Sequence, residues 1–416
     1  MTPDAKWNRP GRVALVLALV FLAGAAARFA GVDWDNFSGL NPDERHMLFM
    51  MSNAQERLHG VDWRSVLGNW FATGLSPLDP RAGNFYVYGD LPHVLGTLAA
   101  EAAGAEGWAD KIGVGRTLSA AFDSLTILIV FAAGLAARLP RMAAVAAAAL
   151  YAAAPLAIQH AHFYVVDTTG VFFVAVSLWA ALRLAAAPGA ARAACAGAAV
   201  GAAAACKISL AMFAVLPAAA VVLGLAASRP GVRGFAGRFV LLGVVSGLAF
   251  LIAFRLLNPS AFAGPGLFDV AISERFLAQL DELAGMTRDL GGTPPGWQWT
   301  LPGIHIGAFR DLALWCVGPG LTVLFLLGCL AAWRAGATMI ALIGALVVLG
   351  ALAWLDVPAV RYALPALPAM AVLGGLGAAT LARSGVGKGV LAALLLLALG
   401  WGQATASIYV TEHPRI

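Results

Sequence analysis

The chain has little charge for its length. Only 12% of its 416 residues are Asp, Glu, Lys or Arg, whereas an ordinary soluble domain carries roughly 25%. Hydrophobic residues make up 60% of the sequence. This composition excludes a soluble globular domain and indicates a polytopic helical membrane protein. The net charge is +5. In so apolar a chain the positions of the Lys and Arg residues report the orientation of the loops, and we expect no nucleic-acid partner.

Cysteine is scarce, and the motifs of soluble-nucleotide chemistry are missing. The four cysteines show no CxxC spacing and fall within apolar runs or at their ends, so we interpret them as small buried hydrophobes without a disulfide framework. The sequence contains no Walker loop, no GxGxxG followed by an acidic residue, no GxSxG and no HExxH. These absences argue against an enzyme that uses a soluble nucleotide.

Long apolar runs dominate the sequence. Eleven runs can cross roughly 30 Å of hydrocarbon, which predicts about 11 transmembrane helices. The runs cover residues 12–32, 112–137, 142–160, 168–187, 191–206, 208–227, 235–256, 311–332, 336–355, 359–381 and 389–409. The region 191–227 contains Lys207, and it could be two short helices that meet at this lysine or one broken helix.

The distribution of charge predicts which ends of these helices face outward. If the N-terminus is cytoplasmic, the inner loops contain one carboxylate, Asp4, and satisfy the positive-inside rule. Their basic residues are Lys6, Arg9, Arg12, Arg138, Arg141, Arg183, Arg192, Arg229, Arg233, Arg238, Arg334, Arg383 and Lys388. All seven histidines and every carboxylate except Asp4 and Asp123 then lie outside. This orientation requires residues 91–104 to form an interfacial helix, and it suits a bacterial inner membrane.

The loops divide the chain into three parts. We predict a transmembrane module at 1–256 that includes a long first outer loop at 33–111. An outer loop with an amphipathic helix follows at 257–309, and C-terminal transmembrane helices occupy 310–416. Within these loops we expect juxtamembrane helices at Pro42–Leu58 and Leu91–Ala103 and the amphipathic helix at about 268–290. Long outer loops on a tightly looped body are where function is expected.

Three carboxylates stand at predicted outer helix ends. Asn41 and Pro42 are typical of a helix start, and Asp43 and Glu44 follow in the first turn. Asp167 starts a transmembrane helix on the same side. Each group could simply cap a helix or complement its dipole. Alternatively, a carboxylate could remove a hydroxyl proton as a general base, or the acids could hold a nucleophile or a divalent metal.

Cations recur at the same predicted surface. Lys207 interrupts an apolar run, and a charged residue at membrane depth is a functional hypothesis by default. A lysine at a helix end can also snorkel to water. Arg361, beside Tyr362, and Arg116 lie at two further outer boundaries. Three cations around one face are suited to a lipid phosphate, which arginine can bind in bidentate fashion.

Two other candidates are weaker. Asp123 lies in the middle of a predicted span, where an acid needs a partner that the sequence does not identify. His160 and His162 share a helix end, but their spacing points the two rings to different faces, which argues against a metal site there.

Several short motifs follow one another in a characteristic order. They are NPDE at 41–44, YVYGDLP at 86–92, GRTLSAAFDSLTILIVFAAG at 115–134, APLAIQHAHFYVVDT at 154–168, ACK at 205–207 and RYALPALP at 361–368. In this set the chain resembles the GT-C superfamily of integral-membrane glycosyltransferases, in its protein O-mannosyltransferase and aminoarabinose-transferase branch. The resemblance covers nearly the whole length.

The resemblance implies a GT-C-like helical bundle and a specific reaction. A sugar would pass, with inversion, from a polyprenyl-phosphate-linked donor to a hydroxyl acceptor on the outer face. The acceptor could be a lipid, a glycan or a protein. The resemblance places catalytic acids at Asp43, with Glu44 beside it, and at Asp167. It places the donor phosphate near Lys207 and near the pair Arg361 and Tyr362. No nucleotide is required, and a divalent metal stays an alternative.

A transporter or flippase of lipid-linked or small anionic substrates is the alternative function. Such proteins are expected to show inverted repeats and polar broken helices near the membrane midplane. Here the ionisable residues concentrate at one predicted surface. The sequence therefore favours the enzyme, with the lipid-linked sugar donor and membrane lipids as its partners.

Overall fold

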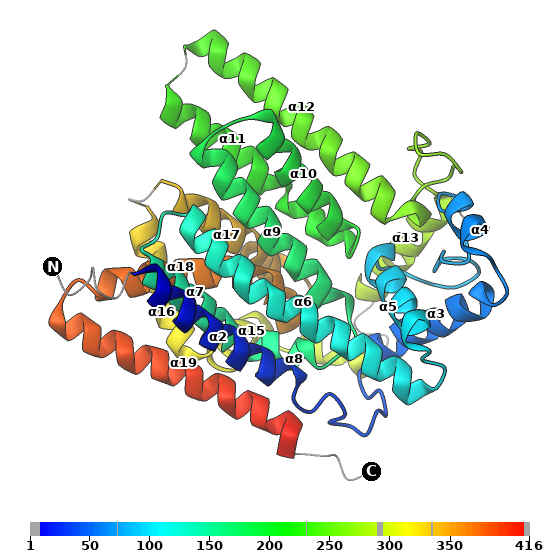
Figure 1. Cartoon of the computed structure of the whole chain (residues 1–416), viewed down its shortest axis with the longest axis horizontal. Helices are drawn as coiled ribbons and strands as arrows, with labels where there is room; N and C mark the ends of the chain where they lie inside the picture. Colours follow the sequence, from blue (N-terminus) through cyan, green and yellow to red (C-terminus); the bar gives the residue numbers. More distant parts are fainter. Residues whose placement is uncertain (1–8, 73, 230, 289–293, 334–335, 412–416) are drawn as a thin grey trace.

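The computed structural model describes residues 9–72, 74–229, 231–288, 294–333 and 336–411. Helices make up nearly all of its regular structure (Figure 1). Within those ranges, the only pairing between extended segments is a single antiparallel bridge between Phe262 and Ile272. The predicted all-α class is confirmed.

Among the residues that the structure describes, seven helical spans are long and apolar enough to cross a membrane. Two of them begin with a 3-10 helix that continues into an α-helix. The spans are α2 (Pro10–Phe29), α6 (Trp108–Ala136), α9 (Val166–Ala186), η1 (Ile208–Ala214) with α11 (Val215–Ser228), α12 (Val232–Leu257), η6 (Val360–Ala366) with α18 (Leu367–Leu381), and α19 (Gly385–Thr411).

Two predicted spans are sharply bent. The first consists of α7 (Arg141–Ala152) and α8 (Pro155–Ala161), which meet at 56° where Pro155 starts the second helix. The second consists of α15 (Ile304–Asp311), its continuation η5 (Leu312–Cys316), and α16 (Pro319–Ala332), with a bend of 110°. Gly318 lies at this bend with φ of 85°, a conformation that glycine adopts readily.

The count of eleven crossings is not confirmed. All eleven apolar runs are largely helical, but two correspond to the shorter helices α10 (Ala190–Ala204) and α17 (Thr338–Trp354). At about 1.5 Å per residue, these reach roughly 22 and 26 Å, less than the hydrocarbon thickness. By length and composition, seven spans in the described part of the chain can cross, or nine if each bent pair counts as one span. Lys207 separates α10 from η1, so two helices meet there.

Several helices outside the spans lie together at one end of the bundle, on the right of Figure 1. They include α3 (Pro42–Leu58), α4 (Trp63–Gly68), α5 (Asp90–Ala103) and α13 (Glu274–Arg288). The two predicted juxtamembrane helices are thus present as α3 and α5. The amphipathic helix begins later than predicted because the preceding residues form the bridge to Phe262. Short helices η2 (Pro259–Ala261), α14 (Pro294–Trp297) and η4 (Gln298–Thr300) belong to the second long segment between spans.

Small residues let the helices approach closely. On α10, a Cβ atom at Gly197 would lie 2.0 Å from the Ser246 carbonyl oxygen of α12, and one at Gly201 would lie 2.5 Å from that of Phe250. This GxxxG spacing is typical of membrane helix pairs, which gain stability from close backbone packing.

The sequence-based division of the chain into three parts at residues 256 and 309 stays a prediction.

Candidate active site

Asp43 is held at the start of α3. The side chain of Asn41 accepts hydrogen bonds from the backbone N–H groups of Asp43 at 2.9 Å and Glu44 at 3.2 Å, so the predicted helix cap is Asn41. The Asp43 carboxylate is therefore not needed as a cap. It accepts a hydrogen bond from Arg361 Nη1 at 2.7 Å. Both side chains keep solvent access, with 26% of Asp43 and 44% of Arg361 exposed.

Asp167 forms the second acid–base pair. The cap of α9 is Val165, so Asp167 lies in the first turn and does not cap the helix. Its carboxylate accepts a hydrogen bond from Lys207 Nζ at 3.2 Å. Lys207 stands in the extended link between α10 and η1, which leaves its ammonium group at the boundary between two helices. Asp167 is 9% exposed, so this pair is more buried than the first.

Tyr362 lies between the two pairs. Lys207 Nζ is 5.2 Å from the centroid of its ring, and Arg361 Cζ is 5.6 Å from the same centroid. Cations at this distance from an aromatic face are attracted by its quadrupole. The structure therefore brings five of the predicted residues into one cluster, which we call the site cluster: Asp43, Asp167, Lys207, Arg361 and Tyr362.

Tyr88 and His46 adjoin the site cluster, and sequence reasoning did not single them out. Burial raises the pKa of Tyr88, and the nearby carboxylates of Asp43 and Asp167 raise it further. The His46 ring packs 6.2 Å from that of Tyr88. Burial lowers the pKa of His46, an effect that Asp43 opposes. The YVYGDLP motif contains Tyr88, but only the folded chain shows that its side chain lies near the acids.

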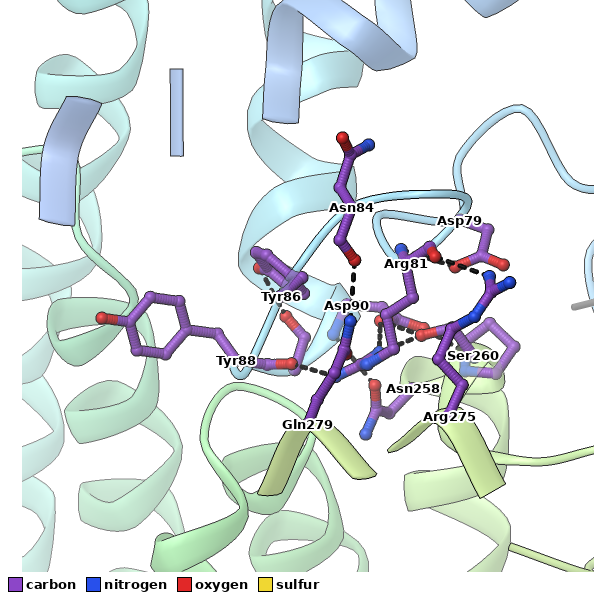
Figure 2. A network of polar contacts seen from close by, with 12 residues as sticks. Asp79, Arg81, Asn84, Tyr86, Tyr88, Asp90, Asn258, Ser260, Arg275 and Gln279 are labelled. Carbon is purple, nitrogen blue, oxygen red and sulfur yellow. Dashed lines mark hydrogen bonds and ion pairs between the residues drawn. The ribbon is translucent and has the colours of Figure 1, made fainter. Parts of the chain in front are cut away.

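A set of hydrogen bonds around Arg81 positions the backbone of Tyr88. Arg81 donates hydrogen bonds to the Tyr88 carbonyl oxygen, the Ser260 hydroxyl and Asp90, the last at 2.8 Å (Figure 2). Asp90 also accepts from the Ser260 N–H at 2.8 Å. Burial raises the pKa of Asp90, whereas Arg81 opposes that shift. In Figure 2 the ring of Tyr88 points away from this network.

The same network joins the two long segments between spans. Arg275 and Gln279 of α13 donate to the backbone oxygens of Arg81 and Asn84, at 2.6 and 2.7 Å (Figure 2). Gly89 donates to the Cys206 carbonyl at 2.9 Å, and a Cβ atom at Gly89 would lie 1.9 Å from the Ala205 oxygen. Only glycine fits there. The loop that carries Tyr88 is thus packed directly against the link that carries Lys207.

Glu44 and Arg116 belong to a different set of contacts, although both were predicted as site residues. Arg116 is fully buried, and its five N–H donors bond to Glu44, Asp35 and the Val32 carbonyl at 2.7 to 3.0 Å. Glu44 also accepts from the Tyr164 N–H at 2.8 Å. A guanidinium with all its donors used has none left for a lipid phosphate. We call Glu44, Arg116 and Asp35 the buried network.

The partner of Asp123 is Arg28. Both side chains are fully buried; Arg28 Nε donates to Asp123 at 2.5 Å, and the Tyr151 hydroxyl donates to the same carboxylate at 2.5 Å. Arg28 also bonds the Gly24 and Ala152 carbonyls at 2.9 Å. These contacts tie α2 to α6 and α7, so Asp123 has a structural explanation.

The residues do not assemble into a metal site. In the described ranges, no group of three or more His, Cys, Asp or Glu side chains is placed to hold an ion. The Nδ1 atoms of His160 and His162 lie 3.0 and 2.8 Å from the carbonyl oxygens four residues earlier. Asp43 and Asp167 each already have a cationic partner. This donor set does not fit a divalent metal, which prefers several oxygen ligands.

Comparison with known proteins extends only to the fold. No family model and no curated protein matches the sequence. An oligosaccharyltransferase of Archaeoglobus fulgidus, solved with a tethered acceptor peptide, has a TM-score of 0.63 at 18% identity. The match covers 97% of this chain and 56% of that one. The oligosaccharyltransferase AglB of the same organism, in complex with an inhibitory peptide and a dolichol-phosphate, has a TM-score of 0.62 at 16% identity, with 96% and 56% covered.

ArnT from Cupriavidus metallidurans is a further structural match. In the apo state it has a TM-score of 0.53 at 18% identity, over 90% of this chain and 60% of its own. The chain spans little more than half the length of the oligosaccharyltransferase structures that it matches. Structural similarity at such low sequence identity establishes the fold and does not establish the reaction. The chain shares the helical fold of these AglB and ArnT structures, as the order of its motifs predicts.

Proposed function

We propose that this protein is a membrane glycosyltransferase that moves a sugar from a polyprenyl-phosphate-linked donor to a hydroxyl acceptor. The observation that carries the proposal is the site cluster. It places two cations and two carboxylates around one tyrosine ring at the end of the bundle where the non-spanning helices gather. Its residue types match what transfer from a lipid phosphate requires, and the GT-C fold agrees with that chemistry.

Lys207 and Arg361 bind the donor phosphate in this proposal. The structure uses one Nζ hydrogen bond of Lys207 for Asp167 and one terminal nitrogen of Arg361 for Asp43. An ammonium group has three donors and a guanidinium has five, so both cations retain donors for phosphate oxygens. They also stabilise the negative charge that develops as the sugar leaves the phosphate. Tyr362 keeps the two cations facing the same space.

Asp43 acts as the general base. Its carboxylate removes the proton of the acceptor hydroxyl, whose oxygen forms a bond to the anomeric carbon. The bond between that carbon and the phosphate oxygen breaks, and the electron pair leaves with the polyprenyl phosphate. In-line attack inverts the anomeric centre.

Asp167 and Glu44 have supporting roles in this mechanism. Asp167 is nearly buried and holds the ammonium group of Lys207. Glu44 and Arg116 tie the start of α3 to α6 and to the Tyr164 backbone, which fixes the position of the neighbouring Asp43. We therefore replace the predicted direct roles of Glu44 and Arg116 with positioning roles. The donor set leads us to propose a reaction that needs no metal.

We place the site on the outer, periplasmic face of a bacterial inner membrane. The support is the positive-inside bias of the opposite loops, which puts the N-terminus in the cytoplasm. A polyprenyl-phosphate donor is membrane-anchored, so no soluble nucleotide has to reach this face. The lipid, glycan or protein that accepts the sugar is to be identified by experiment.

Mass spectrometry of envelope lipids, glycans and exported proteins tests the proposal. Cells with the chain should contain a glycosylated product that is missing in cells without it. Wild-type protein should restore this product, and Asp43→Asn should not. Asp110→Asn, at an exposed position on α6, is the matched control and should restore it. Identical glycan and lipid profiles with and without the chain would contradict the proposal.

A further inference from the structure

A cavity of about 1150 Å³ opens at one end of the bundle. Its walls are contributed by α7, α9, α11, α18 and α19, and most of the lining side chains are alanine and leucine. Ala146, Leu223, Leu376 and Leu395 are representative. The volume exceeds the roughly 300–1,000 Å³ of most ligand pockets, so the cavity can admit a long apolar group.

This cavity is distinct from the site cluster. The helix α9 starts beside the site cluster at Asp167 and reaches the cavity at Ala185. At about 1.5 Å per residue, that separation is roughly 27 Å. The span formed by η6 and α18 likewise runs from Tyr362 to the cavity lining at Ala382. The cavity therefore lies near the opposite membrane surface, which the charge bias makes cytoplasmic.

Two arginines with unused guanidinium groups line the cavity. Arg138 follows α6 and Arg383 follows α18; both are exposed. Across the described ranges, neither guanidinium makes an ion pair or a hydrogen bond. No Asp or Glu is among the described residues that form the lining. An apolar space with two uncompensated positive charges is complementary to an amphiphile that carries a negative head group.

We propose that this cavity binds an anionic phospholipid of the surrounding bilayer. The phosphate lies between Arg138 and Arg383, and an acyl chain enters the space between α7, α18 and α19. Basic pockets between transmembrane helices on the cytoplasmic side are known to hold such head groups. A zwitterionic lipid would bring a second, positive charge to a cavity lining without carboxylates. This inference does not depend on the proposed transferase activity.

Native mass spectrometry of the purified full chain tests the head-group preference. Phosphatidylglycerol should bind on the order of tenfold more tightly than phosphatidylcholine with the same acyl chains. The double variant Arg138→Ala/Arg383→Ala should remove this preference. The control, Arg192→Ala/Arg229→Ala, removes the same charge from inner-loop positions outside the cavity lining, and it should keep the preference. Equal affinity of wild type for the two lipids, or equal losses in the two double variants, would overturn the proposal.

A second set of measurements tests the acyl chain. Ala146→Phe places a bulky ring in the cavity lining and leaves both arginines in place, so phosphatidylglycerol affinity should fall about tenfold. Soluble glycerol phosphate carries the head-group charge without a chain, and it should not displace the lipid at equal concentration. Unchanged affinity in a folded Ala146→Phe variant, or displacement by glycerol phosphate, would show that no chain enters the cavity. If Ala146→Phe fails to fold, the arginine variants decide.

Discussion

Asp43 and Glu44 are neighbours in one turn of α3, yet they enter different environments. Glu44 is fully buried, and both of its oxygens accept hydrogen bonds within the buried network and its surroundings. Asp43 is partly exposed and meets an arginine that is itself 44% exposed. The buried network has its arginine donors used, whereas the site cluster keeps donors unused. Charge alone does not identify a functional residue; access and unused donors do.

This difference has an energetic consequence. Removal of one partner from a buried pair leaves an uncompensated charge and costs about 3–5 kcal/mol. A partly exposed pair contributes roughly 0–1 kcal/mol to stability, because water screens it. Substitutions in the buried network should therefore act mainly on folding, and those in the site cluster mainly on activity. The predictions that follow test this division.

The largest effect on activity is expected for Asp43→Asn. A positioned general base typically contributes 10²- to 10⁴-fold to a rate, so turnover should fall by about that factor while thermal stability stays nearly unchanged. The measurement is release of polyprenyl phosphate from the lipid-linked sugar donor by purified protein. Asp110→Asn serves as the control. Wild-type turnover in Asp43→Asn would refute the assignment of the base.

The largest effect on stability is expected in the buried network. Glu44→Ala and Arg116→Ala should each destabilise the protein by about 3–5 kcal/mol, seen as a lower Tm. The folded fraction should retain more activity than Asp43→Asn does. Glu101→Ala removes an exposed carboxylate of α5 and should be nearly neutral. If Glu44→Ala folds with wild-type Tm but loses turnover, then Glu44 takes part in the chemistry, as the sequence first suggested.

The donor phosphate provides an intermediate test. A hydrogen bond to a charged group contributes about 1.5–3 kcal/mol, so Lys207→Ala and Arg361→Ala should each weaken donor binding about tenfold to a hundredfold. Arg361→Lys should lose less, because it keeps the charge. Lys111→Ala is the control, because it removes a cation that is bonded to Ser52 at the same end of the bundle. Unchanged donor affinity in both alanine variants would remove the phosphate pocket.

The smallest effect is expected for the titration of His93, a buried residue of α5. Burial, together with the charges of Arg57 and Arg81, lowers its pKa to about 3. Between about pH 6.5 and pH 3 the unfolded chain binds a proton here that the folded chain does not. Stability should therefore fall with decreasing pH, by about 1.4 kcal/mol per unit at most.

The variant His93→Leu removes this titration. Its Tm should fall less than that of wild type when the pH is lowered from 7 to 5. His46 also titrates with a lowered pKa in both proteins, so the difference between the two slopes isolates His93. Parallel slopes would mean that His93 gains its proton in the folded state.

Most residues of the site cluster could be predicted from the sequence for a physical reason. In a chain with few charges, each ionisable residue at the end of an apolar run has to be explained. Asp43, Asp167, Lys207 and Arg361 all met that criterion, and the positive-inside bias placed them on one side. The positions of the helices could be predicted equally well, because the length of an apolar run determines where a span can lie.

Other features depended on packing that sequence patterns do not encode. The pairing of Arg28 with Asp123 joins residues 95 positions apart, and the bond from Arg81 to Ser260 joins residues 179 positions apart. Arg116 seemed suited to phosphate until the structure showed its donors in use. The count of eleven crossings is not confirmed, because two apolar helices, α10 and α17, are too short to span by themselves.

Photo-crosslinking of a polyprenyl phosphate with a photoreactive group beside the phosphate would locate the donor directly. Crosslinked peptides from the full chain should come from the segments around Lys207 and Arg361, and unlabelled lipid-linked sugar should compete with the labelling. Labelling elsewhere in the chain, or labelling of these segments that the donor does not displace, would contradict the assignment of the site cluster as the donor site.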